Sequence, residues 1–368
     1  MGLAATVFGV LAAIAWASPD PGRVTDRDTY EKSAAQVIVP DCSDLQCFRV
    51  LVPWTLGRLP GDSIVRWKAY AIVANTAAAV GVWTLCLAFG LTTRAALLAS
   101  ALTALGFGSL YTLHDAFTAD PLMFALGPFM TSALASNRLA AATVMGIVGV
   151  TGKEFAAAPL YAFALYEATA GRWMRALRAC AAGNAAFITW ALLTLTLMLG
   201  FGYSWGWNGV GSADVSSGAA LALWARRMTW RGIASAMFNE FGALYVLAPA
   251  GFALASSPMR RLVLVSLPIA AVFGYVQQPD RGLWNFHYLV TPLAALVLER
   301  APAPLAWSVA ALFAIGNLRV GAQLPIAPLA KAAIAGSLIL AGAAVVMALR
   351  PSATRSARDG MAMEPAAP

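Results

Sequence analysis

Several long apolar runs constrain the fold of this chain more than any other feature. Ala69–Gly90, Trp173–Gly200 and Ala327–Leu349 each approach or exceed the ~18–20 residues that a helix needs to cross a ~30 Å hydrocarbon layer. In lipid, backbone polar groups must be bonded within their own segment, and these runs lack the alternation expected of barrel strands. The sequence therefore predicts an all-α, polytopic membrane protein.

Composition agrees with this class. Hydrophobic residues make up 60% of the 368 residues and charged residues only 11%, against roughly 25% charged residues in a soluble protein. The formal net charge of +8 comes from basic residues scattered singly between the apolar runs. No dense basic patch or aromatic-interleaved stripe exists, so a nucleic-acid partner is excluded and the basic residues are interpreted as topology markers.

We expect about twelve spanning helices, within a range of about 10 to 13, in one transmembrane domain over residues 1–350. Ala15-Trp16-Ala17 resembles a signal-peptidase site, but no basic residues precede it, so a retained first helix is favoured over a cleaved leader. Residues 351–368 are small, polar and rich in Pro and Ala, which predicts a disordered tail. The predicted spans are 2–17, 66–90, 95–112, 120–135, 139–152, 154–170, 176–200, 235–255, 261–276, 283–298, 303–318 and 327–349.

Basic residues in alternate connections indicate the orientation. The connections that contain them are expected on the cytoplasmic side, together with both termini. The extracytoplasmic side then receives a first loop of about 45 residues (18–65), the connection 114–120, the turn at 152–154, the loop 203–231 and the segment 277–287. Nearly every unusual polar residue falls on this one face. The cytoplasmic markers are Arg94, Arg138, Arg172, Arg175, Arg178, Arg260, Arg261, Arg300, Arg350, Arg355 and Arg358.

The first outer loop contains three groups of interest. Asp26 and Asp28 follow the first helix and could act as a general base, hold a divalent metal or be solvated. Arg49 could pair with a carboxylate or bind a phosphate, since its planar fork suits oxyanions, or it could serve as an interfacial residue. Cys42 and Cys47 are a candidate disulfide if the loop faces an oxidising compartment.

The connection after residue 112 carries His114, Asp115 and Asp120. Asp120-Pro121 is typical of a helix start, with Asp as N-cap and Pro at the first helical position. His114 and Asp115 have no such structural explanation at the end of an apolar span, so we expect them near the chemistry. Asp115 and Asp120 are also candidate ligands of a divalent metal, although no compelling ligand set is evident.

Lys153 and Glu154 stand between two apolar runs. Ionisable groups in such a position are costly and indicate function, although snorkelling of both to the interface is the alternative. Adjacent helical residues do not face one another, so the two are not expected to pair with each other. Lys153 could neutralise a phosphate while Glu154 anchors a different group.

The last polar cluster surrounds the start of the span 283–298. Arg281 is a natural phosphate ligand beside Asp280, and Asn285 and His287 lie in the first turns, where they could bind substrate or phosphate. The loop 203–231 is rich in Trp and Arg and predicts either an interfacial helix or a cover over a lipid-linked substrate. Its glycines match neither a dinucleotide fingerprint nor a P-loop.

This pattern resembles the membrane glycosyltransferases with the C-type fold. Asp26 stands four positions before Tyr30, as the first-loop acid and Tyr do in that family, and Asp28 is the nearby alternative. The remaining similar features are Arg49 with Pro53, the acidic pair Asp115 and Asp120, Lys153-Glu154 and Asp280-Arg281.

The resemblance implies an inverting transfer of a sugar from a polyprenyl-phosphate carrier to a hydroxyl of a glycan, lipid or protein acceptor. Asp26 or Asp28 would be the general base, and Lys153, Arg281 and Arg49 would stabilise charge on the departing phosphate. A divalent metal is left open and no other cofactor is implied. The implied location is a bacterial inner membrane.

A transporter or flippase for a lipid-linked or anionic small molecule is the alternative function. It would place its functional groups near the bilayer midplane, commonly within inverted repeats. No internal repeat is evident here and the polar clusters gather at one face, which favours the transferase.

Overall fold

The computed structural model describes residues 2–18, 26–204, 230–276, 283–320 and 329–350. All regular secondary structure in these ranges is helical, which confirms the all-α class. The helices are α1 (Gly2–Ala17), α2 (Arg27–Gln36), η1 (Leu45–Phe48), α3 (Leu51–Gly57), α4 (Ser63–Ala88), α5 (Thr93–Ala104), α6 (Phe107–His114), α7 (Asp120–Ala135), α8 (Leu139–Val150), α9 (Ala158–Thr169), α10 (Trp173–Phe201), α12 (Trp230–Phe241), α13 (Leu244–Leu254), α14 (Ser257–Val276), η3 (Leu283–Phe286), α16 (His287–Arg300), α17 (Ala303–Asn317), η4 (Leu318–Val320) and α18 (Ala330–Leu349).

Four helical stretches in the described ranges are long and apolar enough to cross a membrane: α4, α5 with α6, α10 and α18. Helices α1, α8, α13 and α17 are apolar but shorter. These helices support a membrane protein. The expected total of about twelve spans stays a prediction.

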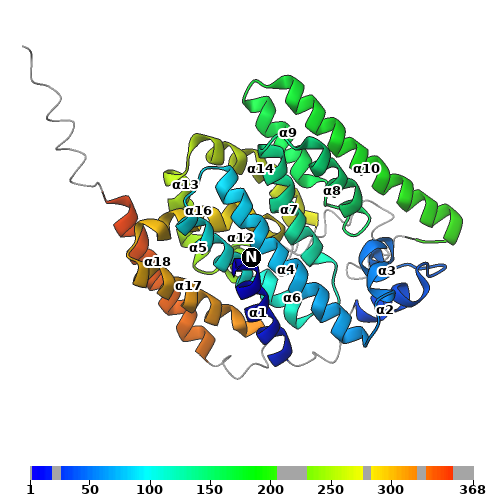
Figure 1. The fold of residues 1–368 in the computed structure, drawn as a ribbon, viewed down its shortest axis with the longest axis horizontal. Helices are drawn as coiled ribbons and strands as arrows, with labels where there is room; N and C mark the ends of the chain where they lie inside the picture. Colours follow the sequence, from blue (N-terminus) through cyan, green and yellow to red (C-terminus); the bar gives the residue numbers. More distant parts are fainter. Residues whose placement is uncertain (1, 19–25, 205–229, 277–282, 321–328, 351–368) are drawn as a thin grey trace, which may run out of the picture.

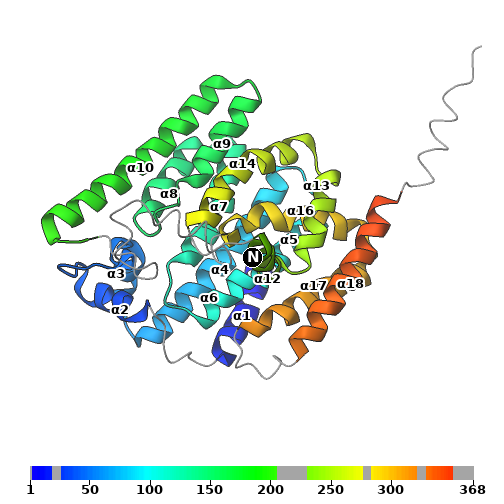
Figure 2. The same cartoon turned by 180° about the vertical axis from the view of Figure 1, so that it is seen from behind.

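Helix α4 lies inside the bundle and packs against α1, α5 and α7, while α10 lies along α8 and α9 (Figure 1). The pair α17 and α18 forms the opposite edge, as the view from behind also shows (Figure 2). Small residues allow the closest contacts, as is common between helices in membranes. A Cβ on Gly81 of α4 would lie 2.8 Å from Pro128 of α7, and one on Gly251 of α13 would lie 1.8 Å from the Leu293 carbonyl oxygen of α16.

Two predicted spans are interrupted. The span 95–112 is divided between α5 and α6 at Gly106, where a Cβ would lie 1.9 Å from the Trp284 ring. The span 235–255 is divided between α12 and α13 beside Gly242, whose φ of +48° suits glycine. Each break follows from a local glycine that hydropathy does not detect.

Helix starts also differ from the prediction. Helix α9 begins at Ala158 instead of 154, because residues 151–157 form turns that contain Lys153 and Glu154. Helix α4 begins at Ser63, three residues early, where the Asp62 carboxylate accepts a hydrogen bond from the Ile64 amide at 2.9 Å.

The first loop is structured. It contains α2, η1 and α3, and a disulfide joins Cys42 to Cys47. The loop is attached to the end of α10, because the Asp41 amide donates to the Phe201 carbonyl at 3.0 Å and the Tyr203 hydroxyl accepts from the Val39 amide at 3.0 Å. The predicted interfacial helix in 203–231 and the predicted tail 351–368 lie almost wholly outside the described residues.

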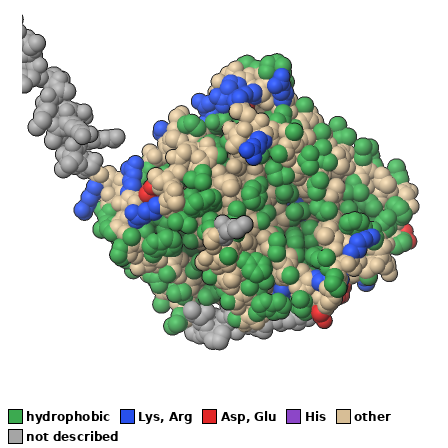
Figure 3. Space-filling view, in the orientation of Figure 1, with side chains coloured by type: hydrophobic (Ala, Val, Ile, Leu, Met, Phe, Trp, Pro, Cys, Tyr) green, Lys and Arg blue, Asp and Glu red, His purple; other side chains and the backbone are tan. Residues whose placement is uncertain are grey.

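The two ends of the bundle differ in charge. The first loop, the start of α7 and the turn between α8 and α9 lie at one end (Figure 1). Lys and Arg side chains gather over the connection of α9 and α10, at the upper edge in Figure 3, where Arg172, Arg175 and Arg178 stand. The turn with Lys153 and Glu154 precedes α9, so the length of this helix separates it from those arginines.

Candidate functional site

Arg49 and Glu154 form a two-point ion pair at the end of the bundle that carries the first loop. Arg49 Nε donates to Glu154 Oε2 at 3.0 Å and Arg49 Nη2 donates to Oε1 at 2.8 Å. The two side chains are 9% and 11% exposed. Such paired, charge-assisted bonds fix both the position and the plane of the guanidinium.

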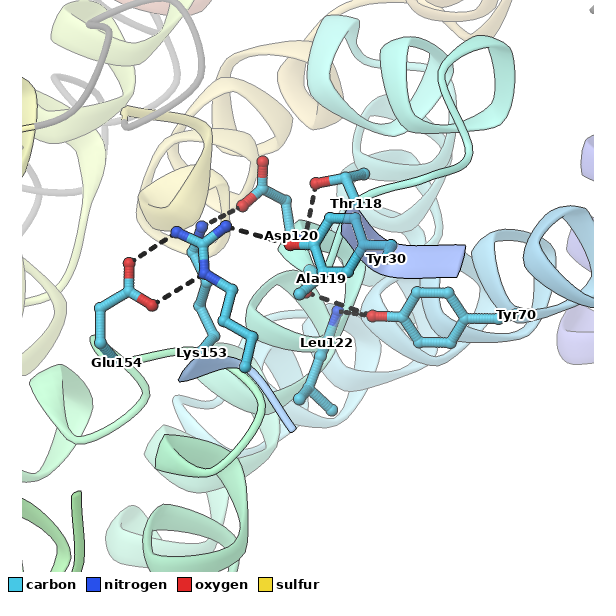
Figure 4. A network of polar contacts seen from close by, with 9 residues as sticks. Tyr30, Tyr70, Thr118, Ala119, Asp120, Leu122, Lys153 and Glu154 are labelled. Carbon is cyan, nitrogen blue, oxygen red and sulfur yellow. Dashed lines mark hydrogen bonds and ion pairs between the residues drawn. The ribbon is translucent and has the colours of Figure 1, made fainter. Parts of the chain in front are cut away.

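Lys153 pairs with a different carboxylate. Its Nζ lies 2.5 Å from Asp120 Oδ1, and the two side chains are only 4% and 7% exposed. Neighbouring residues 153 and 154 thus point to separate partners, as the sequence predicts. Figure 4 shows Lys153, Asp120, Glu154 and Tyr30 converging. Two positive and two negative charges are brought together, so the four formally compensate one another.

Tyr30 extends the pairs toward the first loop. Arg49 Nη1 donates to the Tyr30 hydroxyl at 3.1 Å, and Tyr30 is fully buried. The Tyr30 ring packs on Trp67 of α4 with 5.1 Å between ring centroids, and Trp67 in turn packs on Phe117 at 5.3 Å. An aromatic wall therefore supports one side of the charged cluster, which we define as Tyr30, Arg49, Asp120, Lys153 and Glu154.

The start of α7 is held by Tyr70 of α4. Its hydroxyl donates to the Ala119 carbonyl at 3.2 Å and accepts from the Leu122 amide at 3.0 Å, bracketing Asp120 (Figure 4). Helix α7 begins at Asp120 itself, with Ala119 at the N-cap position and no side-chain cap. The prediction of Asp120 as N-cap is wrong, because its carboxylate is engaged by Lys153 instead.

The turn between α8 and α9 is held by close backbone packing. The Leu51 amide at the start of α3 donates to the Thr151 carbonyl at 3.1 Å. A Cβ on Gly152 would lie 2.5 Å from Leu122 Cδ2 and 3.4 Å from the Leu51 side chain. Glycine at 152 thus allows the turn to approach both α3 and α7, which brings Lys153 and Glu154 to their partners.

Burial and the neighbouring charges set the protonation of the cluster. Burial alone would raise the pKa of Glu154, but the charges of Arg49 and Lys153 outweigh it and hold this pKa at about 2. Burial alone would lower the pKa of Arg49, but Glu154 raises it well above its ordinary value. Burial, together with the Arg49 charge, lowers the pKa of Lys153 against the opposing effect of Asp120 and Glu154.

Tyr30 is kept in its neutral form. Burial raises the pKa of its hydroxyl to about 12, against the lowering effect of Arg49. The negative charges of Asp26 and Asp120 raise it further. Tyr30 therefore acts as a neutral hydroxyl at ordinary pH, and Asp26 lies close enough to influence it.

The two candidate bases of the first loop take different positions. Asp26 immediately precedes α2 and is half-buried, whereas Asp28 is exposed. Residues i and i+4 share a helix face, so Asp26 lies on the side of α2 that carries buried Tyr30. Of the two carboxylates, Asp26 is the one whose charge acts on Tyr30 of the cluster.

His114 and Asp115 lie at the end of α6. The His114 ring Nδ1 is 3.1 Å from the Ser18 hydroxyl, and both residues line a cavity of ≈ 10 Å³ beside α1. The Tyr111 hydroxyl donates to Asp115 Oδ2 at 3.1 Å. These described contacts direct the two side chains to the ends of α1 and α6.

Asn285 and His287 are buried in the core beneath the start of α7. His287 Nδ1 donates to the Trp284 carbonyl at 2.8 Å, and its ring packs edge-on against Phe124, with 5.9 Å between centroids. Phe124 is one helical turn beyond Asp120, so His287 lies one layer deeper than the charged cluster. Asp280 and Arg281 lie outside the described residues.

Asp115 and Asp120, the candidate metal ligands, have other partners in the structure. Within the described ranges, no three His, Cys, Asp or Glu side chains gather as a metal-ligand set. Asp120 is paired with Lys153 and Asp115 accepts from Tyr111. The Lys153 ammonium supplies the positive charge beside Asp120, so no step is assigned to a metal here.

Two supporting residues were missed by the sequence reasoning. Tyr70 is hidden in an apolar helix and gives no sequence signal. Lys68 is buried in α4 and donates to the carbonyls of Ala15 at 3.0 Å and Ser18 at 2.9 Å, which ties α4 to the end of α1. A lysine inside an apolar span is costly, and that signal could have identified it.

Comparison with known proteins gives a match at the level of structure. No family model matches the chain, and no curated protein matches its sequence. The oligosaccharyltransferase of Archaeoglobus fulgidus in the apo form aligns with 99% of this chain, at 14% identity and a TM-score of 0.50. The same enzyme tethered to an acceptor peptide containing the NVT sequon aligns at 15% identity and a TM-score of 0.47.

The aligned region covers 58% of the apo archaeal enzyme, so this chain spans little more than half of that protein's length. At this identity the likeness concerns the fold alone. It supports the C-type membrane glycosyltransferase fold that the sequence resemblance implies.

Proposed function

We propose that this protein is an integral membrane glycosyltransferase that moves a sugar from a polyprenyl-phosphate carrier to an acceptor hydroxyl. The observation that carries the proposal is the buried charged cluster, in which three segments distant in sequence bring two cations and two carboxylates together. Arg49 also bonds Tyr30 of the helix that follows Asp26. Burying ionised groups is costly, so a chain retains them where they serve a purpose. The shared fold with a membrane glycosyltransferase supports the same function.

The chemistry assigned to the site is a single displacement. Asp26 takes the proton of the acceptor hydroxyl as that oxygen bonds to the anomeric carbon. The bond from this carbon to the carrier phosphate breaks, the configuration inverts, and polyprenyl phosphate leaves with the bonding electrons. A lipid-linked sugar phosphate already has an activated leaving group, so the reaction needs no nucleotide.

Arg49 and Lys153 are the proposed groups that stabilise the departing phosphate. Arg49 uses three of its five N–H donors in its bonds to Glu154 and Tyr30. The carboxylates of Glu154 and Asp120 fix both cations in place before substrate arrives. Prepositioned charges of this kind lower the barrier most, because they need no reorganisation during the reaction.

We place the site on the extracytoplasmic side of a bacterial inner membrane, with both termini in the cytoplasm. The disulfide Cys42–Cys47 lies in the same loop as Asp26 and Arg49, and disulfides persist in oxidising compartments. The arginine-rich connection of α9 and α10 lies at the other end of α9, as basic cytoplasmic connections would. The charged cluster also occupies helix ends and turns and not the middle of a long span, which favours transfer over transport.

Sugar transfer by the purified protein tests the proposal. Radiolabelled polyprenyl-phosphate sugars would be offered with glycan, lipid and protein acceptors that carry free hydroxyl groups. Wild-type protein should transfer label from at least one donor. Asp26→Asn should lower the rate by about 100-fold or more. The matched variant Asp28→Asn, two residues further on at an exposed position in the first turn of α2, should stay near the wild-type rate.

Other outcomes are equally informative. Loss of sugar transfer in Asp28→Asn alone would assign the general base to Asp28. Full transfer activity in both variants would show that neither first-loop carboxylate is the general base. If no donor is consumed and the wild-type protein moves a labelled lipid-linked sugar across proteoliposomes, a transporter replaces the transferase.

A further inference from the structure

A groove lies far from the charged cluster, at the other end of α9. It has a volume of ≈ 440 Å³ and is formed where the end of α9 meets α13 and the start of α14. Its polar wall includes Thr169, Arg260 and Arg261, and its apolar wall includes Phe252, Leu264 and Val265. The groove therefore has a cationic part and an apolar part side by side.

The cationic part is not neutralised by the protein. The nearby carboxylate of Glu167 is buried and is paired with Arg172. Among the described residues, neither Arg260 nor Arg261 forms an ion pair with a carboxylate. The guanidinium carbon of Arg261 lies 5.7 Å from the centroid of the Tyr166 ring, which holds this side chain against α9. Two positive charges thus line the groove without an anionic partner.

The apolar part continues onto the outer surface of α14. Leu264 is 54% exposed and Leu267 is 55% exposed. Both belong to the apolar helix α14. These side chains form a strip that leads away from the arginines along the helix. A ligand with an anionic head and a hydrocarbon tail matches this arrangement in both charge and polarity.

We propose that the groove binds an anionic glycerophospholipid, with its phosphate on Arg260 and Arg261 and an acyl chain along Leu264 and Leu267. Basic pockets between membrane helices bind such headgroups by charge-assisted hydrogen bonds to phosphate. Arginine is suited to this task because its planar fork matches two phosphate oxygens. The site is separate from the sugar-transfer site and its occupancy does not depend on that activity.

Native mass spectrometry of the full chain in detergent would test the proposal. Phosphatidylglycerol and phosphatidylcholine with identical acyl chains would be titrated onto wild-type protein, R260Q/R261Q and the matched variant R175Q/R178Q. Arg175 and Arg178 are exposed arginines on α10 outside the groove, so the control removes the same charge. Wild type should prefer phosphatidylglycerol, R260Q/R261Q should bind it at least about tenfold more weakly, and R175Q/R178Q should match wild type.

Several results would overturn the proposal. Equal affinity of wild type for the two lipids would do so without any variant, and so would equal weakening in both double variants, which indicates general charge. Inorganic phosphate would be added as a competitor in a further experiment. If it displaced phosphatidylglycerol at equimolar concentration, the groove would bind a free anion and not a lipid. Phosphatidylcholine binding to each variant serves as the measure of an intact fold.

Discussion

Arg49 and Glu154, 105 residues apart in sequence, meet in a two-point ion pair with N···O distances of 3.0 and 2.8 Å. The pair joins the first loop to the turn between α8 and α9. It therefore holds the segment that carries Asp26 and Tyr30 against the segment that carries Lys153. The same contact determines both the local fold and the position of the proposed phosphate-stabilising charges.

Removing one partner of this pair should destabilise the protein strongly. Arg49→Met or Glu154→Leu alone leaves a buried, unpaired charge. We expect either substitution to lower the free energy of unfolding by about 3–5 kcal/mol. The double variant should regain much of that loss, since no charge remains uncompensated. Thermal unfolding in detergent would measure the three variants against wild type.

The pair Arg27 and Glu31 provides the control for that cycle. It is an i,i+4 pair with side chains 26% and 36% exposed, so its removal should cost only about 0.3–0.5 kcal/mol. If Glu154→Leu proved as mild as Glu31→Leu, the buried pair would not hold the loop in place.

The low pKa of Glu154 makes one part of the stability dependent on pH. Its pKa is about 2 in the fold and 4.5 ordinarily, so its ionised form stabilises the fold fully above pH 4.5. This contribution is lost as the pH falls through the interval from 4.5 to about 2. The difference in unfolding temperature between wild type and Glu154→Gln should stay constant from pH 8 to pH 5 and narrow below pH 4.5. A difference that already narrows between pH 8 and pH 6 would contradict this assignment.

Hydropathy was sufficient to predict the helical membrane class and the approximate place of α4, α10 and α18. It could not locate the breaks at Gly106 and Gly242, because these depend on a packed tryptophan ring and on a positive φ. Both features are properties of the folded molecule.

For the site residues too, the sequence predicts some features and only the folded structure shows the others. Lys153 and Glu154 are evident as costly charges between apolar runs, and the sequence predicts that they do not pair with each other. In the structure both lie in the turns at 151–157 and contact separate partners. Their partners were not evident, since nothing local indicates that Glu154 meets Arg49 or that Lys153 meets Asp120. Asp120 was misassigned because Asp-Pro is a frequent helix start, whereas a buried lysine 33 positions later, at 2.5 Å, engages its carboxylate.

Tyr70→Phe should weaken the start of α7. The substitution removes the hydroxyl that bonds both the Ala119 carbonyl and the Leu122 amide. We expect the free energy of unfolding to fall by about 1–3 kcal/mol, because both backbone groups lose a hydrogen-bond partner. Sugar transfer should fall more than stability alone explains, because Asp120 lies between these two groups and orients Lys153. The control Tyr161→Phe loses a hydrogen bond to Asn184 at an exposed site and should leave both unfolding temperature and transfer rate near wild type. If the two variants changed unfolding temperature and transfer rate equally, Tyr70 would have no positioning role.

Gly152→Ala should displace the turn that carries Lys153 and Glu154. The added Cβ would lie 2.5 Å from Leu122 Cδ2, so the turn or the leucine must move, at a cost of about 1–3 kcal/mol. Gly200→Ala is the matched control, since a Cβ there has no neighbour within 4 Å and the residue lies in helix α10. The second substitution Leu122→Val shortens the opposing side chain and should restore part of the stability and of the transfer rate. Rescue of stability without rescue of transfer would show that the turn, and not the leucine, has moved, and that the two ion pairs depend on the exact backbone position of residue 152.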